Sequence, residues 1–304
     1  MILIKVEDRD QFGQGNRSRG IAIAQILSRE KIDYCIISST RKWFDYLKLN
    51  LFETILIEKD YNSNLEVEAI SNSFESFKID FIVLDGDRFD MNYIDLLISH
   101  QIKSVILDDV AKIKRTNAWR LINPNIYATG DLYSGWGVKS YLGGDYVLLR
   151  DAFQKAPQFL PIKNKILLAL GVMMDPISTL QLSNRLEAAG FKIKIAIGLS
   201  PEEMVDEIDS SALIVCGVSV TLHEVWNRKR IALPIYQAKD QILFHEFLKS
   251  KNIPQIISIG RTKSDVVEDI VSFVIKNASK MNPQICLNEP RIDILFKELV
   301  NDAQ

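Results

Sequence analysis

The sequence predicts an α/β protein built from two doubly wound domains, each with a parallel sheet. Short, continuous runs rich in Ile and Val alternate with helix-like runs, a pattern typical of strands buried on both faces of a parallel sheet. The alternation breaks over residues 124–160, which are rich in Gly, Tyr and Asn, and then restarts. At 304 residues, the chain also exceeds the size that one hydrophobic core usually serves.

The first half of the chain begins with an apolar strand, a glycine loop and a helix. Several of its strand-like runs end in Asp or Asn, at the edge where open α/β sheets bind ligands. Strands are predicted over residues 2–6, 34–37, 54–57, 81–85, 104–109 and 120–123, and helices over residues 18–29, 64–77 and 92–99.

The second half repeats this alternation after two prolines, Pro157 and Pro161. Strands are predicted over residues 165–170, 191–197, 212–216, 231–235 and 255–259, and helices over 178–189, 201–208, 222–228, 241–249, 264–275 and 293–300. We therefore expect a first domain over residues 1–157, a second over 158–288, and a last helix, within 289–304, that packs back on the first. Two such domains are expected to face a cleft that serves as the binding site.

The composition is that of a soluble globular protein, with 47% apolar and 25% charged residues. A net charge of −2 gives no support to a nucleic-acid groove or a basic membrane face. No apolar run approaches the ~20 residues that span a bilayer, and no leader pattern precedes the first strand, so a cytoplasmic location is expected.

The metal-binding residue types do not form a recognisable pattern. Cys35, Cys216 and Cys286 are scattered, and neither they nor the three histidines have the spacing of metal ligands. We predict no bound metal and no cofactor, apart from a Mg²⁺ ion that a diphosphate ligand could carry. His223 is the one histidine close to a predicted ligand loop.

The first glycine loop runs from Gly13 through Gly15 and Asn16 to Arg19. It follows a strand and precedes a helix, whose first N–H groups carry partial positive charge. Glycine also lets the backbone approach a ligand closely. The pattern is typical of a cradle for an anionic or sugar-bearing ligand, and the alternative is an ordinary strand-to-helix turn.

Two loops in the second half have the same character. Residues 217–221 (Gly217, Val218, Ser219, Val220 and Thr221) follow one strand, and residues 171–175, which begin with Gly171, follow another. Ser219 and Thr221 could cap the next helix or bond phosphate oxygens. Glu224 could complete a capping box, or accept hydrogen bonds from the hydroxyls of a ribose.

Further motifs stand in a fixed order along the chain. They comprise Leu84-Asp85, Asp108-Asp109, Asn123-Pro124-Asn125, the segment from Gly143 through Tyr146 and Arg150 to Phe153, and Asp240-Gln241. Together with the three loops, they resemble the motifs of the GT-B-like family of UDP-sugar hydrolases in pseudaminic acid biosynthesis. The resemblance covers roughly residues 2–245 and extends to the peptidoglycan N-acetylglucosaminyltransferase, which shares that fold.

The resemblance implies a GT-B fold and a UDP-sugar substrate. Glu224 would hold the ribose, the backbone of residues 217–221 the diphosphate, and the first loop the sugar. Carried over position by position, the binding residues are Gly13, Gly15, Arg19, Arg150, Gly171, Gly217, Val218, Ser219, Thr221, Glu224, Asp240 and Gln241. Arg17 or Arg19 would stabilise the leaving diphosphate.

The sequence departs from the family at the residue expected to activate water. The family has a histidine where this chain has Asn16, and a carboxamide cannot serve as a general base. A family tyrosine is also replaced, by Gly86-Asp87. The candidate catalytic residues are therefore Asn16 as a hydrogen-bond donor and Asp87 or Asp109 as the base, with Asp85 and Asp108 as further carboxylates.

Three functions stay open from the sequence. The first is a UDP-sugar hydrolase with a relocated base. The second is a glycosyltransferase of the same fold, favoured by the loss of the water-activating histidine. The third is a degenerate protein that binds a nucleotide-sugar without turnover.

Overall fold

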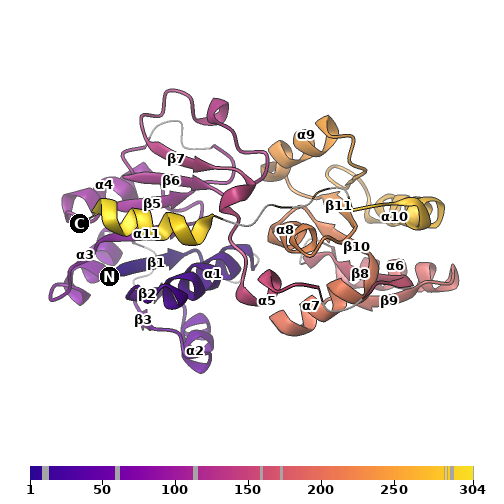
Figure 1. The fold of residues 1–304 in the computed structure, drawn as a ribbon, viewed down its shortest axis with the longest axis horizontal. Coiled ribbons are helices and arrows are strands. Elements are labelled where there is room, and N and C mark those ends of the chain that lie inside the picture. The colour runs from indigo at the N-terminus through magenta and orange to yellow at the C-terminus, as the bar shows by residue number, and fades with distance from the viewer. Residues whose placement is uncertain are drawn as a thin grey trace. The chain divides into compact units, whose positions relative to one another are not determined.

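The computed structural model describes residues 1–8, 14–58, 62–111, 116–157, 160–171, 174–283, 285, 287 and 291–303. The chain divides into two compact units (Figure 1). Unit 1 comprises Met1–Leu148 and Glu289–Gln304, and unit 2 comprises Leu149–Asn288. The chain therefore leaves unit 1 after Leu148 and returns to it before its last helix.

Unit 1 contains a seven-stranded sheet in the order β3-β2-β1-β4-β5-β6-β7, and every pairing is parallel. The strands are β1 (Ile2–Val6), β2 (Tyr34–Ser38), β3 (Thr54–Leu56), β4 (Phe81–Asp85), β5 (Ser104–Leu107), β6 (Arg120–Asn123) and β7 (Lys139–Leu142). The helices are α1 (Gly15–Arg29), α2 (Arg41–Leu49), α3 (Ser63–Ser73), α4 (Met91–Ser99) and α11 (Ile292–Ala303), with short 3-10 turns at Gly130–Tyr133 and Gly144–Tyr146.

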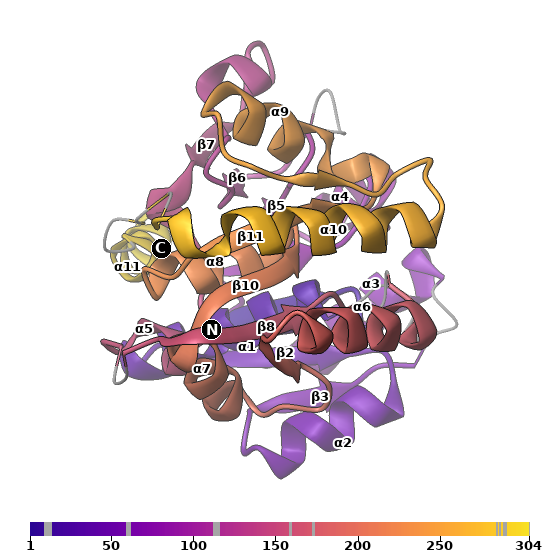
Figure 2. The ribbon, with the colours of Figure 1, turned by 90° about the vertical axis from the view of Figure 1, so that its right-hand side faces the viewer.

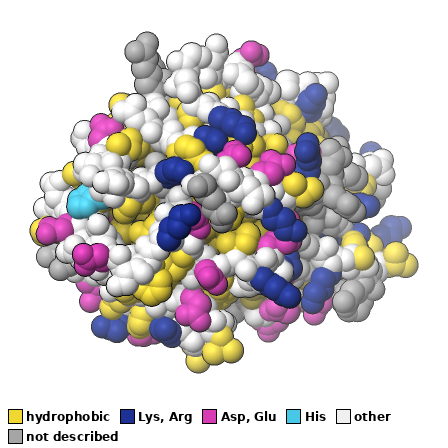
Figure 3. Space-filling model, turned by 60° about the vertical axis from the view of Figure 1, so that its left-hand side comes forward, with side chains coloured by type: hydrophobic (Ala, Val, Ile, Leu, Met, Phe, Trp, Pro, Cys, Tyr) yellow, Lys and Arg dark blue, Asp and Glu magenta, His cyan; other side chains and the backbone are white. Residues whose placement is uncertain are grey.

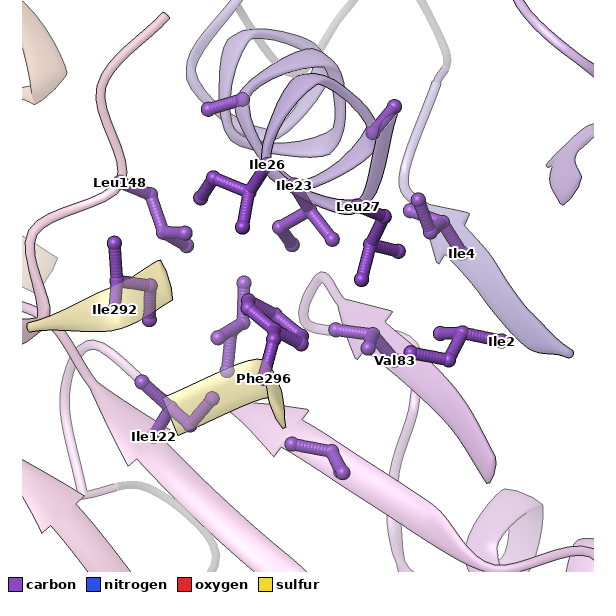
Figure 4. Packing of buried hydrophobic residues seen from close by; sticks show 14 of the residues in the cluster. Ile2, Ile4, Ile23, Ile26, Leu27, Val83, Ile122, Leu148, Ile292 and Phe296 are labelled. Carbon is purple, nitrogen blue, oxygen red and sulfur yellow. The ribbon is translucent and has the colours of Figure 1, made fainter. Parts of the chain in front are cut away.

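Hydrophobic clusters cover both faces of this sheet. Alternate residues of β1 point to opposite faces, so that Ile2 and Ile4 pack with α1 and α11, whereas Leu3 packs with α3 and α4. Figure 4 shows Ile292 and Phe296 of α11 lying among side chains from α1 and the sheet. Helix α11 thus completes one side of the unit 1 core.

Unit 2 contains a five-stranded parallel sheet in the order β12-β11-β10-β8-β9. Helices α6 and α10 lie side by side over one hydrophobic cluster of this unit (Figure 2). The strands are β8 (Ile162–Ala169), β9 (Lys192–Ile195), β10 (Ser211–Gly217), β11 (Ala232–Tyr236) and β12 (Ile256–Ile257). The helices are α5 (Asp151–Gln154), α6 (Pro176–Ala188), α7 (Pro201–Ser210), α8 (Val220–Asn227), α9 (Ile242–Ser250) and α10 (Lys263–Asn277), with 3-10 turns at Lys239–Gln241 and Ala278–Lys280.

Several helices begin where a side chain caps their first N–H groups. Asp90 caps α4, Asp175 caps α6 ahead of Pro176, and Ser200 and Glu203 form a capping box at α7. Asp175, the last residue of the loop that begins with Gly171, is therefore a helix cap.

The structure corrects two expectations about unit 1. The strand series does not close at residues 120–123, because β7 pairs with β6 within a stretch in which no strand was expected. Helix α1 begins at Gly15 rather than Ser18, so most of the predicted first loop is helical. Within the same stretch, Tyr133, Trp136 and Tyr141 are packed, since each is less than a tenth exposed.

Within the part of the chain that the structure describes, each helix is too short or too polar to cross a membrane.

On the face drawn in Figure 3, Lys and Arg side chains are interspersed with Asp and Glu. That face therefore shows no field of a single sign, in keeping with the net charge of −2.

Candidate functional site

Each sheet has one point at which the strand order reverses. In unit 1, β1 and β4 are neighbours, and the chain moves outward from them in opposite directions. In unit 2, the corresponding pair is β8 and β10. Open α/β sheets bind ligands outside the carboxyl ends of their strands at such a point. The two candidate sites, one in each unit, are therefore the carboxyl edges of these strand pairs.

Arg19 organises the carboxyl edge of unit 1. Its Nε and one terminal nitrogen bind both oxygens of Asp85, at 2.8 and 2.7 Å. Its other terminal nitrogen lies 2.8 Å from Oδ2 of Asp109. The Asp85 side chain is 2% exposed and the Asp109 side chain 37%. All three guanidinium nitrogens thus bind carboxylates, and Asp109 is the more accessible of the two acids.

The segment that follows β6 holds Asp109 from its other side. Asn125 donates from Nδ2 to Oδ1 of Asp109, at 2.9 Å, and to Oδ1 of Asn123, also at 2.9 Å. The hydroxyl of Tyr127 donates to the Asp109 carbonyl oxygen. Tyr133 donates to the carbonyl oxygen of Asp108, at 2.9 Å. The sequence motif of Asn123 and Asn125 therefore positions the Asp109 carboxylate.

Asn16 and Gly86 complete this edge. The Nδ2 group of Asn16 donates to the carbonyl oxygen of Asp85, at 3.1 Å, so Asn16 acts as a donor here, as its chemistry requires. Gly86 has a φ of +148°, and a Cβ placed on it would lie 2.6 Å from Cβ of Glu7. Asp87, the other proposed base, is exposed in the same turn.

The remaining residues of the predicted first loop are less directly placed. Gly13 lies outside the described residues, and Gly15 is the first residue of α1. Arg17 is buried, donates to the carbonyl oxygen of Asp8 and lies over the Trp43 ring. The Arg17 side chain therefore packs within unit 1 instead of lying exposed at the start of α1.

Sequence reasoning missed a second charged network beside this edge. Lys5 lies inside β1 with no exposed surface, and its Nζ contacts Glu66 of α3 at 2.9 Å. Arg88 binds both oxygens of Glu66, at 2.7 and 2.6 Å, and lies 3.6 Å from Glu7. Burial lowers the pKa of Lys5 more than Glu66 raises it. The sequence signal was the one charged residue within the apolar run of β1.

The carboxyl edge of unit 2 contains the second loop. Ser219 precedes α8, and its side chain makes no capping hydrogen bond, so the first of its two alternatives, the cap, is wrong. Val218 is buried, Thr221 lies in the first turn, and Gly217 ends β10. A Cβ on Gly217 would lie 2.6 Å from Oε1 of Gln237, so this position accepts no side chain without displacing that amide.

Glu224 forms an ion pair instead of the alternative capping box. Its Oε1 lies 2.9 Å from a terminal nitrogen of Arg150, and its side chain is 4% exposed. Burial raises the pKa of Glu224, and Arg150 lowers it by a smaller amount. Arg150 and Glu224 are thus brought together, as two of the predicted binding residues.

Other polar groups of α8 and of the turn after it hold the segment that begins unit 2. Asn227 donates to the carbonyl oxygen of Phe153, at 2.8 Å. Arg228 donates to the carbonyl oxygen of Lys155 and is paired with Asp209, with neither side chain exposed. The helix that follows the Gly217 loop is therefore bonded to residues 150–156.

The last predicted binding residues lie in the loops after β8 and β11, the two strands that flank β10. Gly171 is exposed, with a φ of +61°. Asp240 is exposed in a 3-10 turn, and Oε1 of Gln241 accepts from the backbone N–H groups of Gln237 and Ala238. Gln241 therefore orders the turn after β11. Among the described residues, no cluster of His, Cys, Asp and Glu could hold a metal ion.

No protein-family model matches the sequence, and no curated protein does. Solved structures do match over nearly the whole chain. MurG of Acinetobacter baumannii superposes with a TM-score of 0.62 at 14% identity, covering 99% of each chain. The chain has a GT-B-like fold. A UDP-GlcNAc 2-epimerase of Neisseria meningitidis, solved with UDP-GlcNAc, matches with a TM-score of 0.58 at 13% identity, over 99% of this chain and 100% of that one.

A third solved structure also matches. The spinosyn forosaminyltransferase SpnP matches with a TM-score of 0.56 at 11% identity, over 100% of this chain and 95% of that one. At such identities the likeness concerns the fold alone.

Proposed function

We propose that the chain is an enzyme of nucleotide-sugar metabolism, and that it hydrolyses a UDP-sugar to UDP and the free sugar. The observation that carries this proposal is the partly exposed Asp109 carboxylate, held by Arg19 and Asn125 at the switch point of unit 1. The GT-B-like fold supports it, because its solved examples include an epimerase bound to UDP-GlcNAc and a forosaminyltransferase.

Unit 2 would hold the nucleotide. Backbone N–H groups of the loop after β10 and of the first turn of α8 would donate hydrogen bonds to the diphosphate. The side chain of Ser219 does not cap these groups. Glu224, held through one oxygen by Arg150, would accept hydrogen bonds from the ribose hydroxyls. A Mg²⁺ ion carried by the diphosphate is compatible with this assignment.

Unit 1 would supply the base. Asp109 accepts a proton from water as the water oxygen bonds to the anomeric carbon of the sugar. The bond from that carbon to the diphosphate oxygen breaks, and its electron pair leaves with UDP. Asp109 then releases its proton to solvent, so that one water is consumed for each UDP and free sugar formed.

A glycosyltransferase is the second candidate, and Asn16 favours it. The Asn16 side chain donates to the Asp85 carbonyl oxygen, so it takes no part in activating water. A transferase would use Asp109 in the same way, with the hydroxyl group of an acceptor in place of water.

The deciding experiment measures UDP release from a panel of UDP-sugars, including the diacetamido-trideoxy donor, without an acceptor. Release of UDP and free sugar, lost in Asp109→Asn and kept in Asp33→Asn, supports the hydrolase. Binding of UDP without release points to the transferase or to a binder without turnover. Absence of binding by every UDP species refutes the assignment of the nucleotide loop.

Glu224→Ala is expected to weaken UDP binding by about 1–3 kcal/mol, because the ribose hydroxyls lose a charged acceptor. Isothermal titration calorimetry with UDP measures the loss. The matched control is Glu202→Ala, which removes an exposed carboxylate from α7 of the same unit. An affinity equal to that of the control would show that Glu224 serves only to hold Arg150.

A further inference from the structure

The carboxyl edge of unit 1 contains one cation between two carboxylates. Arg19 binds Asp85 through two nitrogens and Asp109 through the third. With all three ionised, this trio carries one negative charge in excess. Because the Arg19 side chain is 11% exposed and that of Asp85 2%, solvent screens this excess poorly. Binding one proton stabilises such a trio, because the proton removes the excess negative charge.

We propose that Arg19, Asp85 and Asp109 act as one proton-accepting unit, in which Asp85 neutralises Arg19 so that Asp109 can still take a proton from the attacking hydroxyl group. This inference rests on the proposed function for the identity of that hydroxyl group. It assigns Arg19 and Asp85 as positioning residues, instead of giving Arg19 a role against the diphosphate.

An arginine beside a carboxylate base weakens the tendency of that base to accept a proton. A guanidinium beside a single carboxylate keeps that carboxylate ionised and makes it a poor proton acceptor. Here Asp85 accepts two hydrogen bonds from Arg19, and Asp109 accepts only one. The two carboxylates therefore compete for one cation.

The other groups that face the trio are either neutral or negatively charged. Asp87 and Asp108 are the further carboxylates at this edge, and both add negative charge. Tyr127 and Tyr133 come from the segment after β6, and burial raises the pKa of each phenol well above its usual value. Both tyrosines are thus neutral donors, and Arg19 is the positive partner in this trio.

The experiment titrates the carboxyl carbons of the full chain, labelled at aspartate, by nuclear magnetic resonance. The Asp109 signal is identified by its loss in Asp109→Asn. In Asp85→Asn, Arg19 is left to Asp109 alone, so the titration midpoint of that signal should fall by about one pH unit. In Arg19→Gln, two carboxylates lose their cation, and the midpoint should rise by about as much. Asp33→Asn removes an exposed carboxylate ahead of β2, at the other edge of the sheet, and should leave the midpoint unchanged.

Opposite shifts in the two variants support the inference. An unchanged midpoint in either folded variant, or shifts in the same direction, would overturn it; if Asp85→Asn fails to fold, the Arg19→Gln titration decides alone. Where UDP release is measurable, the acid limb of its pH profile should move with the midpoint. Opposite shifts in a protein that releases no UDP would leave the proton-accepting unit standing and refute the hydrolase.

Discussion

Replacing Asp209 with alanine is expected to lower the free energy of unfolding by about 3–5 kcal/mol. Asp209 of α7 and Arg228, just after α8, form an ion pair with no exposed surface on either side chain. Removing the carboxylate leaves a buried guanidinium without its counter-charge, and desolvation of that charge is not repaid by the carbonyl oxygens of Lys155 and Ala156. Chemical denaturation of the full chain measures the change.

A surface pair in the same unit provides the matched control for this prediction. Arg185 and Glu268 lie 2.6 Å apart, with side chains 44% and 57% exposed. Glu268→Ala is expected to cost about 0–1 kcal/mol, because solvent screens an exposed pair. A double variant, Asp209→Leu with Arg228→Met, should recover much of the lost stability. Equal effects of Asp209→Ala and Glu268→Ala would show that burial does not set the energy of these pairs.

Gly86→Ala is expected to destabilise unit 1 by about 2–4 kcal/mol. The φ of +148° at this position is one that L side chains rarely adopt, and the new Cβ would lie 2.6 Å from Cβ of Glu7. The strand β1 and the turn after β4 would have to separate. Because Asn16 and Asp85 border the same turn, the variant should also lower any UDP-sugar turnover that remains.

Gly130→Ala is the control for Gly86→Ala. A Cβ on Gly130 meets no atom within 4 Å, and its φ lies outside the glycine region, so the change should be within about 0.5 kcal/mol of zero. Thermal unfolding of both variants under one set of conditions gives the comparison. A Gly86→Ala protein as stable as Gly130→Ala would mean that the turn relaxes freely around the added methyl group.

The carboxyl edges could be predicted from the sequence because strand ends are local features. Asp85 and Asp109 follow apolar runs, and parallel strands bring their carboxyl ends to one edge. The pairing with Arg19 could not be predicted in this way, because it depends on where α1 begins. With Gly15 as its first residue, Asn16 and Arg19 are three apart in a helix and lie on one side of it.

Two further features escaped prediction for physical reasons. The strand β7 is short and flanked by glycines, and it forms because it pairs with β6 at the edge of the sheet. The partner of Lys5 is Glu66, which belongs to helix α3 and is distant in the sequence. A charge inside an apolar strand indicates that some partner exists, but the identity of that partner depends on tertiary packing.

The return of α11 to unit 1 has a consequence for the order of folding during synthesis. Ile292, Leu295, Phe296 and Leu299 belong to the same core cluster as β1 and α1, so that cluster lacks one wall until residues 292–303 have left the ribosome. Unit 2 has all of its own residues earlier, because it is one continuous segment. Although domains usually fold in the order of translation, here the segment translated second would complete its core first, and the N-terminal half would wait for the last helix.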